Sequence, residues 1–283
     1  MVLESIMNPF KAERKPWEMF FVGFLYSSVA MMLSMWIFEK YASLVMVFLT
    51  SLACAPLIYY TIKLEEKKDT EIDGEVNLLK EHSKALSFLM FMFAGITISC
   101  TLWYILLPSS WATNLFSIQT ETITSINSKI TGLSIDHFSI LTKIFLNNVK
   151  VLIFCVLFAF VYGLGAIFIL AWNASVIGVA IGNFARTHFS DYINATGIVK
   201  LAGYFHIGGL SLLRYSLHGI PEILAYFVGG LAGGIISVAV IQHDFGTKNF
   251  EKILLDSSDL MLISVGILLF AAIVEVFVTP IFF

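Results

Sequence analysis

Long stretches of mostly apolar residues alternate with short polar segments along the chain, and all but the last, which contains Glu275, are uncharged. About 20 apolar residues cross the hydrocarbon core of a bilayer as a helix, so each stretch of this length predicts a transmembrane span. The stretches that qualify are Met19–Phe38, Ala42–Ile62, Ala85–Pro108, Val151–Ala185, Ile223–Gln242 and Leu260–Phe283. Because only "EKY" separates the first two, they are expected to form a helical hairpin with a tight turn.

Two parts of the second half do not fit a simple span. The run Val151–Ala185 is too long for one crossing, and we expect the polar "AWNAS" near its middle to divide it into one full and one short helix. The piece Leu201–Leu213 is too short to cross and is rich in glycine. It predicts either a re-entrant or half-helix element near 201–222 or a plain interfacial helix. The fold class is all-α, a polytopic transmembrane helical bundle of about six to seven spans.

Composition excludes several classes of protein. Of 283 residues, 58% are hydrophobic and 13% are charged, which is not the balance of a soluble protein. No basic tract is available to follow nucleic-acid phosphates, so the bilayer, not nucleic acid, is the expected partner. Cys54, Cys100 and Cys155 each lie inside an apolar stretch and are expected to pack rather than to bind metal or form disulfides. The histidines lack metal-ligand spacing, and we expect no cofactor.

The distribution of lysine and arginine predicts the orientation. Basic residues precede the first span and recur between 63 and 84, whereas 109–142 contain only Lys129. Because cytoplasmic loops are enriched in basic residues, the N-terminus is expected in the cytoplasm of a multi-pass cell-membrane protein. We divide the single integral membrane domain, 1–283, into an N-terminal hairpin (1–63), a cytoplasmic charged loop (64–84), a third span (85–108), an outer polar segment (109–145), a core (146–242), and a cytoplasmic loop with the last span (243–283).

The two polar segments have alternative interpretations. The charged loop 64–84 is expected to be a solvated helical extension of the neighbouring spans, rather than a partner-docking site. The outer segment 109–145 is either an amphipathic helix on the membrane surface or a connecting loop.

Polar residues inside membrane spans are costly, and in this chain they concentrate in the second half. The predicted binding or structural polar cluster consists of Asn147, Asn148, Asn173, Arg214, His218, Gly219 and Glu222. It is followed by "GGLAGG", in which Gly229 and Gly233, and Gly230 and Gly234, form two overlapping G-x-x-x-G pairs. Such pairs let helix backbones approach closely, and we favour packing within one chain over a homo-oligomer interface.

Several spaced elements carry a family resemblance over about 147–242. They are the paired Asn147 and Asn148, glycines late in the following helix, Asn173, and His218–Gly219 with Glu222 before a Gly/Ala-rich helix. This pattern resembles the stage II sporulation protein M family, and the opening "PWEMFFVGFLYSSVAMMLSMWIF" is similar to its archaeal branch, a membrane domain of unknown function. Family members usually have proline directly before His-Gly, where this chain has Leu217. The resemblance implies a polytopic scaffold, which in sporulating bacteria works with two peptidoglycan-degrading partners.

Three classes of function follow. The first is a scaffold that recruits membrane or envelope proteins. The second is a transporter or channel subunit with a polar site at Asn147, Asn173, Arg214, His218 and Glu222. The third is an intramembrane hydrolase with Glu222 as general base, which lacks any supporting H-E-x-x-H or G-x-S-x-G motif. We call His218–Gly219 with Glu222 the signature. Its structural explanation is that a helix begins at Pro221 and has the carboxylate of Glu222 in its first turn. His218 would then precede the helix, and the two side chains would not share a face.

Overall fold

The computed structural model describes residues 9–72, 74–130, 137–162, 165–189, 196–242 and 246–282. Within these ranges it contains helices and no strand. Among the described residues, seven helices are long and apolar enough to cross a membrane, which confirms the predicted all-α, multi-span fold. They are α3 (Glu18–Ile37), α4 (Ala42–Glu71), α5 (Glu75–Leu106), α8 (His137–Tyr162), α9 (Gly165–Phe189), α10 (Gly197–Gln242) and α11 (Lys248–Ile273).

Short elements connect and flank the seven long helices. The predicted tight hairpin is confirmed, because the single 3₁₀ turn η1 (Glu39–Tyr41) joins α3 to α4. The remaining short elements are α2 (Pro9–Arg14), α6 (Ser109–Leu115), α7 (Ser117–Ile130), the π-helical turn η3 (Val274–Val278) and α12 (Thr279–Phe282).

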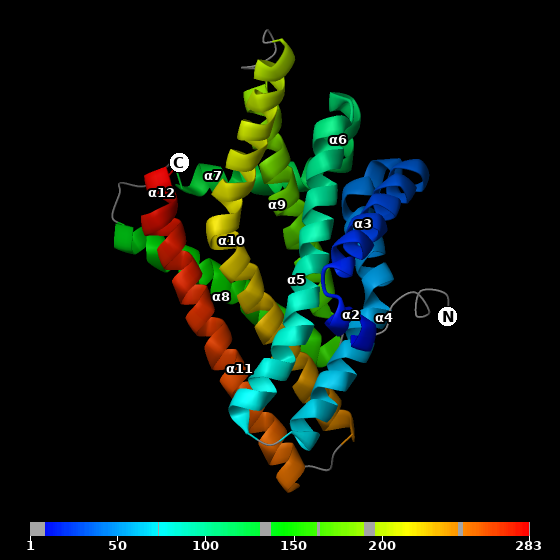
Figure 1. Ribbon diagram of the computed structural model, residues 1–283, viewed down its shortest axis with the longest axis vertical. Coiled ribbons are helices and arrows are strands. Elements are labelled where there is room, and N and C mark those ends of the chain that lie inside the picture. Colours follow the sequence, from blue (N-terminus) through cyan, green and yellow to red (C-terminus); the bar gives the residue numbers. More distant parts are fainter. Residues whose placement is uncertain are drawn as a thin grey trace.

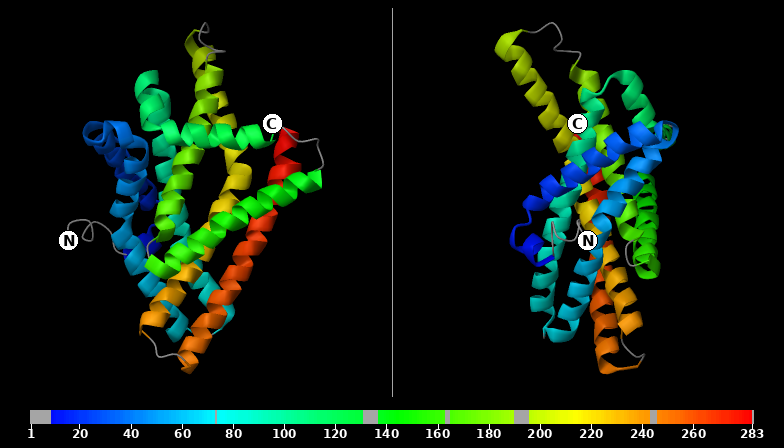
Figure 2. Two further views of the ribbon diagram at one scale, coloured as in Figure 1. Left: turned by 180° about the vertical axis from the view of Figure 1, so that it is seen from behind. Right: turned by 90° about the vertical axis from the view of Figure 1, so that its right-hand side faces the viewer.

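Most of the long helices run along the length of the bundle, whereas α8 crosses it at a steep angle (Figure 1). The α4–α5 and α10–α11 turns lie at one end, where Lys252 Nζ donates a hydrogen bond to the carbonyl of Ile72 at 2.8 Å. The basic α2 segment lies toward the same end, because Glu13 contacts Lys68 of α4. We call this the charged end. At the opposite end, α7 lies across the bundle at a steep angle to the spans (Figure 2).

The described part of the outer polar segment is helical except for the turn at Phe116, and its α7 is anchored by a buried amide. Gln119 is fully buried and joins three helices. Its Oε1 accepts a hydrogen bond from Ser43 Oγ of α4 at 2.6 Å, and its Nε2 donates to Ser175 Oγ of α9 at 3.2 Å. Leu115 and Phe116 are fully buried at the α6–α7 junction. Some apolar side chains of this segment, such as Leu115 and Phe116, are therefore buried in the bundle, whereas Trp111 is exposed on its surface.

The predicted break at "AWNAS" is wrong. The chain forms two full-length helices instead, with α8 ending at Tyr162 and α9 beginning at Gly165. The glycines late in the fourth apolar run, which belong to the family resemblance, are Gly163 and Gly165. Gly163 lies outside the described residues. Asn173 sits inside α9, where its Nδ2 donates to the carbonyl of Ile169 at 2.8 Å. An amide that bonds one turn back along its own helix is satisfied, so it does not interrupt the helix.

The predicted re-entrant element near 201–222 is also wrong, as is the helix start at Pro221. Both regions belong to α10, one continuous helix of 46 residues with Pro221 in its interior. A helix satisfies nearly all of its backbone groups internally, which is the main requirement in lipid, and glycine or proline within it is tolerated there. The glycines between 203 and 209 therefore do not interrupt the helix.

The charged loop 64–84 is helical on both sides of its turn, as expected, but only part of it is solvated. It consists of the last turns of α4 and the first turns of α5. Glu65, Asp69 and His82 in these turns are each 1% exposed or less. The prediction of solvation therefore holds for exposed residues such as Lys67 and Glu71, but not for the side on which the two helix ends pack against each other at the charged end.

Candidate functional site

The continuity of α10 places three residues of the signature region on one helix face. His218, Glu222 and Tyr226 are four residues apart, and side chains at this spacing are neighbours on a helix. Tyr226 is fully buried, and its Oη donates a hydrogen bond to Glu222 Oε1 at 2.8 Å. The expectation that His218 and Glu222 do not share a face is therefore wrong, because it depended on a helix start at Pro221.

The π-helical turn η3 brings a second carboxylate to this face. It contains Glu275, which is close enough to Glu222 for the two side chains to interact electrostatically. Thr279 comes directly after η3, and its Oγ1 lies 3.4 Å from Nδ1 of His218. The π turn inserts an extra residue into the helix and changes the direction of the side chains that follow, a feature that recurs at functional sites. We call His218, Glu222, Tyr226, Glu275 and Thr279 the polar face.

Among the described residues, the other predicted polar residues make no hydrogen bond or ion pair with the polar face, although the charge of Arg214 acts electrostatically on His218. Arg214 lies two helical turns from Glu222, and its guanidinium packs over the Phe184 ring of α9 at 5.3 Å. Asn147 is exposed on α8, whereas its neighbour Asn148 is buried. Asn173 is occupied within α9. Gly219 is buried beside an apolar cavity of about 340 Å³ between α5, α9 and α10.

The four glycines after the signature lie where α10 meets other helices of the same chain. A Cβ added at Gly233 would come within 2.6 Å of the carbonyl oxygen of Val156 in α8. At Gly229 it would meet Leu152 of α8, at Gly230 it would meet Ala166 of α9, and at Gly234 it would meet Ile62 of α4. Small residues at these positions allow close helix contact in lipid, where helices lack a hydrophobic driving force for association.

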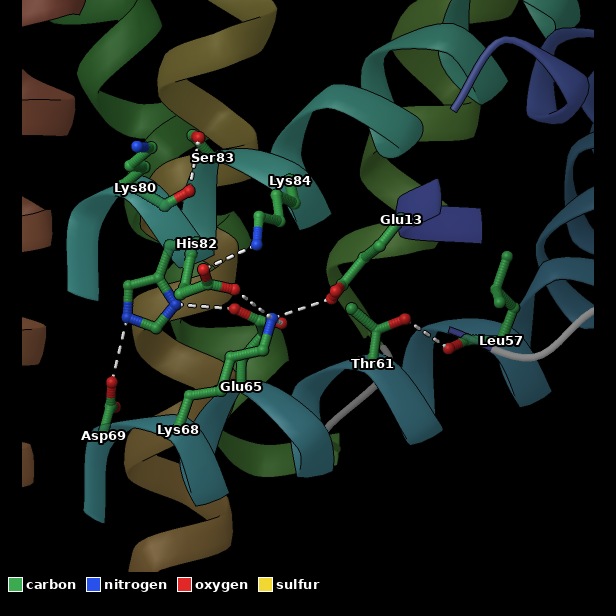
Figure 3. A network of polar contacts seen from close by, with 11 residues as sticks. Glu13, Leu57, Thr61, Glu65, Lys68, Asp69, Lys80, His82, Ser83 and Lys84 are labelled. Atoms are coloured by element: carbon green, nitrogen blue, oxygen red, sulfur yellow. Dashed lines mark hydrogen bonds and ion pairs between the residues drawn. The ribbon is translucent and has the colours of Figure 1, made fainter. Parts of the chain in front are cut away.

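A second polar group, which the sequence interpretation missed, lies at the charged end (Figure 3). Lys68 Nζ of α4 lies 2.8 Å from Glu13 Oε1 of α2 and 2.7 Å from Glu65 Oε1. His82 of α5 bridges two acids of α4, with Nδ1 2.7 Å from Glu65 Oε2 and Nε2 2.9 Å from Asp69 Oδ1. We call these five residues the inner charge cluster. The detectable sequence signal was the spacing of Glu65, Lys68 and Asp69 by three and four residues, which places them on one helix face.

The inner charge cluster lies beyond the hydrocarbon core. The uncharged run Ala42–Ile62 already fills about 30 Å of helix, so the last turns of α4 extend past it. Burial by itself lowers the pKa of His82, but the hydrogen-bonded carboxylates of Asp69 and Glu65 outweigh it and raise this pKa to about 9. Burial raises the pKa of Asp69, with His82 opposing it. His82 is therefore protonated at neutral pH, and it joins α5 to α4 as a buried ion pair.

The protonated state of His82 predicts a stability change with pH. Its pKa is about 9 in the folded protein and about 6.5 when unfolded, so its stabilising contribution is complete below about pH 6.5 and is lost as the pH rises through 9. The thermal unfolding midpoint of the purified protein in detergent should fall by several degrees between pH 7 and pH 9.5. The acids facing His82 are Glu65 and Asp69, and Asp256 and Asp259 of α11 line a cavity beside it.

Two histidine variants provide the control for this prediction. His82→Gln should abolish this part of the pH dependence, whereas His206→Gln, at an exposed position of α10, should retain it. An unfolding midpoint that falls equally in the His82→Gln protein would contradict the assignment.

Neither group is arranged to hold a metal ion. Among the residues that the structure describes, no three histidine, cysteine or acidic side chains are grouped so that they could bind one. The polar face offers groups for hydrogen bonding and proton exchange within membrane-spanning helices.

Comparison with known proteins identifies the family. The sequence model of the family described as Stage II sporulation protein M matches residues 85–280. The chain belongs to the stage II sporulation protein M family. The region shared with this family extends beyond the 147–242 of the resemblance at both ends. It includes all of the polar face, with Glu275, whereas the inner charge cluster precedes it. No curated protein and no solved structure matches the chain.

Proposed function

We propose that this family member is a cell-membrane scaffold that recruits partner proteins of a membrane or envelope complex. Its charged end faces the cytoplasm in this proposal, in agreement with the excess of lysine and arginine there. The proposal rests mainly on one observation: α10, with the end of α9 beside it, extends beyond α5 and carries exposed apolar side chains at that end.

The length of α10 indicates how far it projects. Gly219 lines the same cavity as Thr97, near the middle of the apolar part of α5. From Gly219 back to Gly197 the helix extends roughly 33 Å, whereas α5 continues for roughly 14 Å beyond Thr97 before it ends. Half of the hydrocarbon core is about 15 Å thick, so the first turns of α10 lie outside it. The projecting end, with the end of α9 beside it, is visible in both figures (Figures 1 and 2).

The projecting end of α10 carries exposed apolar side chains, although it lies outside the hydrocarbon core and lipid tails do not cover it. Ile198 is 83% exposed and Phe205 is 74% exposed, with Val199 and Leu201 also exposed between them. The Phe189 ring of α9 packs on Tyr204 with ring centroids 4.8 Å apart, which fixes the two helices to each other. Contiguous apolar surface outside a membrane core marks a protein-interaction site, and a paired, pre-ordered helix end offers it at low entropic cost.

Site-specific photocrosslinking in cells tests the proposal. A photoreactive residue at Val199 or Phe205 should produce adducts with the same protein, and Ile198→Asp should remove these adducts. The control position is Leu262, which is 71% exposed on the apolar face of α11 and should give lipid adducts. Lipid adducts alone at all three positions would contradict recruitment through this end.

A transporter or channel subunit is the second candidate, favoured by the two membrane-embedded carboxylates of the polar face. Glu222 and Glu275 both lie within spans, and such residues commonly mark ion or proton pathways. One variant, tested by crosslinking in cells and by flux into proteoliposomes, distinguishes the two functions. Glu222→Gln should leave the protein crosslinks of the scaffold unchanged, whereas in a transporter it should abolish solute or proton flux into proteoliposomes without unfolding the protein.

A further inference from the structure

A cavity of about 590 Å³ opens at the outer end of the bundle, between the end of α3, the turn η1, the end of α5 and the helix α6. Three of the five tryptophans of the chain line it: Trp36, Trp103 and Trp111. Glu39 lines the same cavity, with Ser110 and Asn114 as further polar groups. The cavity lies outside both the polar face and the inner charge cluster.

Hydrogen bonds fix the side chain of Trp103 and the α5–α6 turn at the edge of this cavity. Trp103 Nε1 donates to Ser28 Oγ at 3.1 Å, so its N–H is already used and its ring remains to line the cavity. The α5–α6 turn is held by Arg186, which donates to the carbonyls of Tyr104 and Leu107 and to Ser109 Oγ at 3.1, 3.3 and 2.9 Å. Glu39 begins the 3₁₀ turn that follows α3 directly.

The lining has the chemistry of a cation site. The face of an indole ring attracts cations, and several indoles around a carboxylate are suited to ammonium groups that carry apolar substituents. None of the described residues that line the cavity is basic, and Lys40, next to Glu39 in sequence, is not among them. Glu39 forms no ion pair within the described ranges.

Membrane anchoring alone explains less of this arrangement. Trp36 and Trp111 are 82% and 58% exposed near the ends of two spans, where tryptophans commonly contact lipid headgroups. Anchoring requires neither a shared cavity nor a carboxylate among the rings. We propose that Trp36, Trp103, Trp111 and Glu39 form a binding site for an organic ammonium group. That group belongs either to a phospholipid headgroup or to a free small molecule.

Ligand-observed NMR with tetramethylammonium tests the site. The full chain is placed in nanodiscs of phosphatidylglycerol, a lipid without an ammonium group, and the methyl signal is titrated. Saturable binding is expected, and Glu39→Gln or Trp111→Leu should weaken it at least tenfold, which is 1.4 kcal/mol. Trp17→Leu, which changes an exposed tryptophan outside this cavity, should leave the affinity unchanged. Binding that is equal in the wild-type and Glu39→Gln proteins would overturn the proposal.

Two further measurements separate charge from shape and identify the source of the ligand. Choline should bind at least tenfold more tightly than its uncharged isostere 3,3-dimethylbutanol, and equal affinities would overturn the cation site. Replacing phosphatidylglycerol by phosphatidylcholine should weaken choline binding if the headgroup occupies the site. Unchanged choline binding in those discs assigns the site to a free ammonium compound instead. Neither result depends on partner recruitment by α10.

Discussion

Lys68→Met is expected to destabilise the protein by about 3–5 kcal/mol, because it leaves the largely buried Glu13 without its lysine partner and Glu65 with His82 alone. The side chain of Lys68 is 13% exposed, and those of Glu13 and Glu65 are 11% and 0% exposed. Removing the ammonium removes the partner that both acids share. The effect should appear as a lower midpoint of thermal or urea unfolding in detergent, measured by circular dichroism.

The neighbouring lysine is a matched control for this substitution. Lys67 pairs with Glu71 at 3.3 Å, but both side chains are more than 60% exposed. Exposed pairs contribute about 0–1 kcal/mol, so Lys67→Met should change stability little. If the two variants had equal stability, the ion pairs of Lys68 would not support the fold. The contact of Lys68 with Glu13 also predicts that α2 becomes sensitive to protease in the Lys68→Met protein and not in the Lys67→Met protein.

Gly95→Ala is expected to push α3 away from α5 and to destabilise the bundle by about 2 kcal/mol. An added Cβ would overlap the carbonyl oxygen of Phe20 and would lie 2.9 Å from the amide nitrogen of Phe24. Gly23 of α3 makes the reciprocal close approach to the carbonyl of Met92 in α5. Because the obstructing atoms are backbone, one helix must move, and overpacking of this kind costs about 1–3 kcal/mol.

The helix α11 provides the control for Gly95→Ala. A Cβ at Gly266 meets nothing within 4 Å, and Gly266 is exposed. Alanine is favoured over glycine in a helix by up to about 1 kcal/mol, so Gly266→Ala should be neutral or stabilising. Unfolding in detergent would compare the two variants. A Gly95→Ala protein as stable as Gly266→Ala would show that α3 and α5 are less closely packed than the structure indicates.

The candidate site could be predicted in part. Glu222 and His218 were identified because ionisable residues inside apolar runs are rare and easily seen in sequence. Their partners were not identified. The hydrogen bond from Tyr226 depends on an unbroken α10 through Pro221, and the approach of Glu275 depends on the π turn of a helix more than 50 residues away. Proline and glycine were interpreted as helix breakers, although in a bundle that covers its backbone they need not be.

The sequence alone determined that this protein crosses the membrane several times, approximately where it does so, and which family signature it carries. These properties are local, since an apolar run of sufficient length must form a helix in lipid to satisfy its own backbone groups. The tertiary structure alone decided that Glu65, Asp69 and His82 of the charged turns are buried, that Glu39 and three distant tryptophans share a cavity, and that α10 projects beyond α5. Each of these depends on which helix surfaces pack together. Burial and electrostatic environment arise from contacts between helices and cannot be assigned from any single segment.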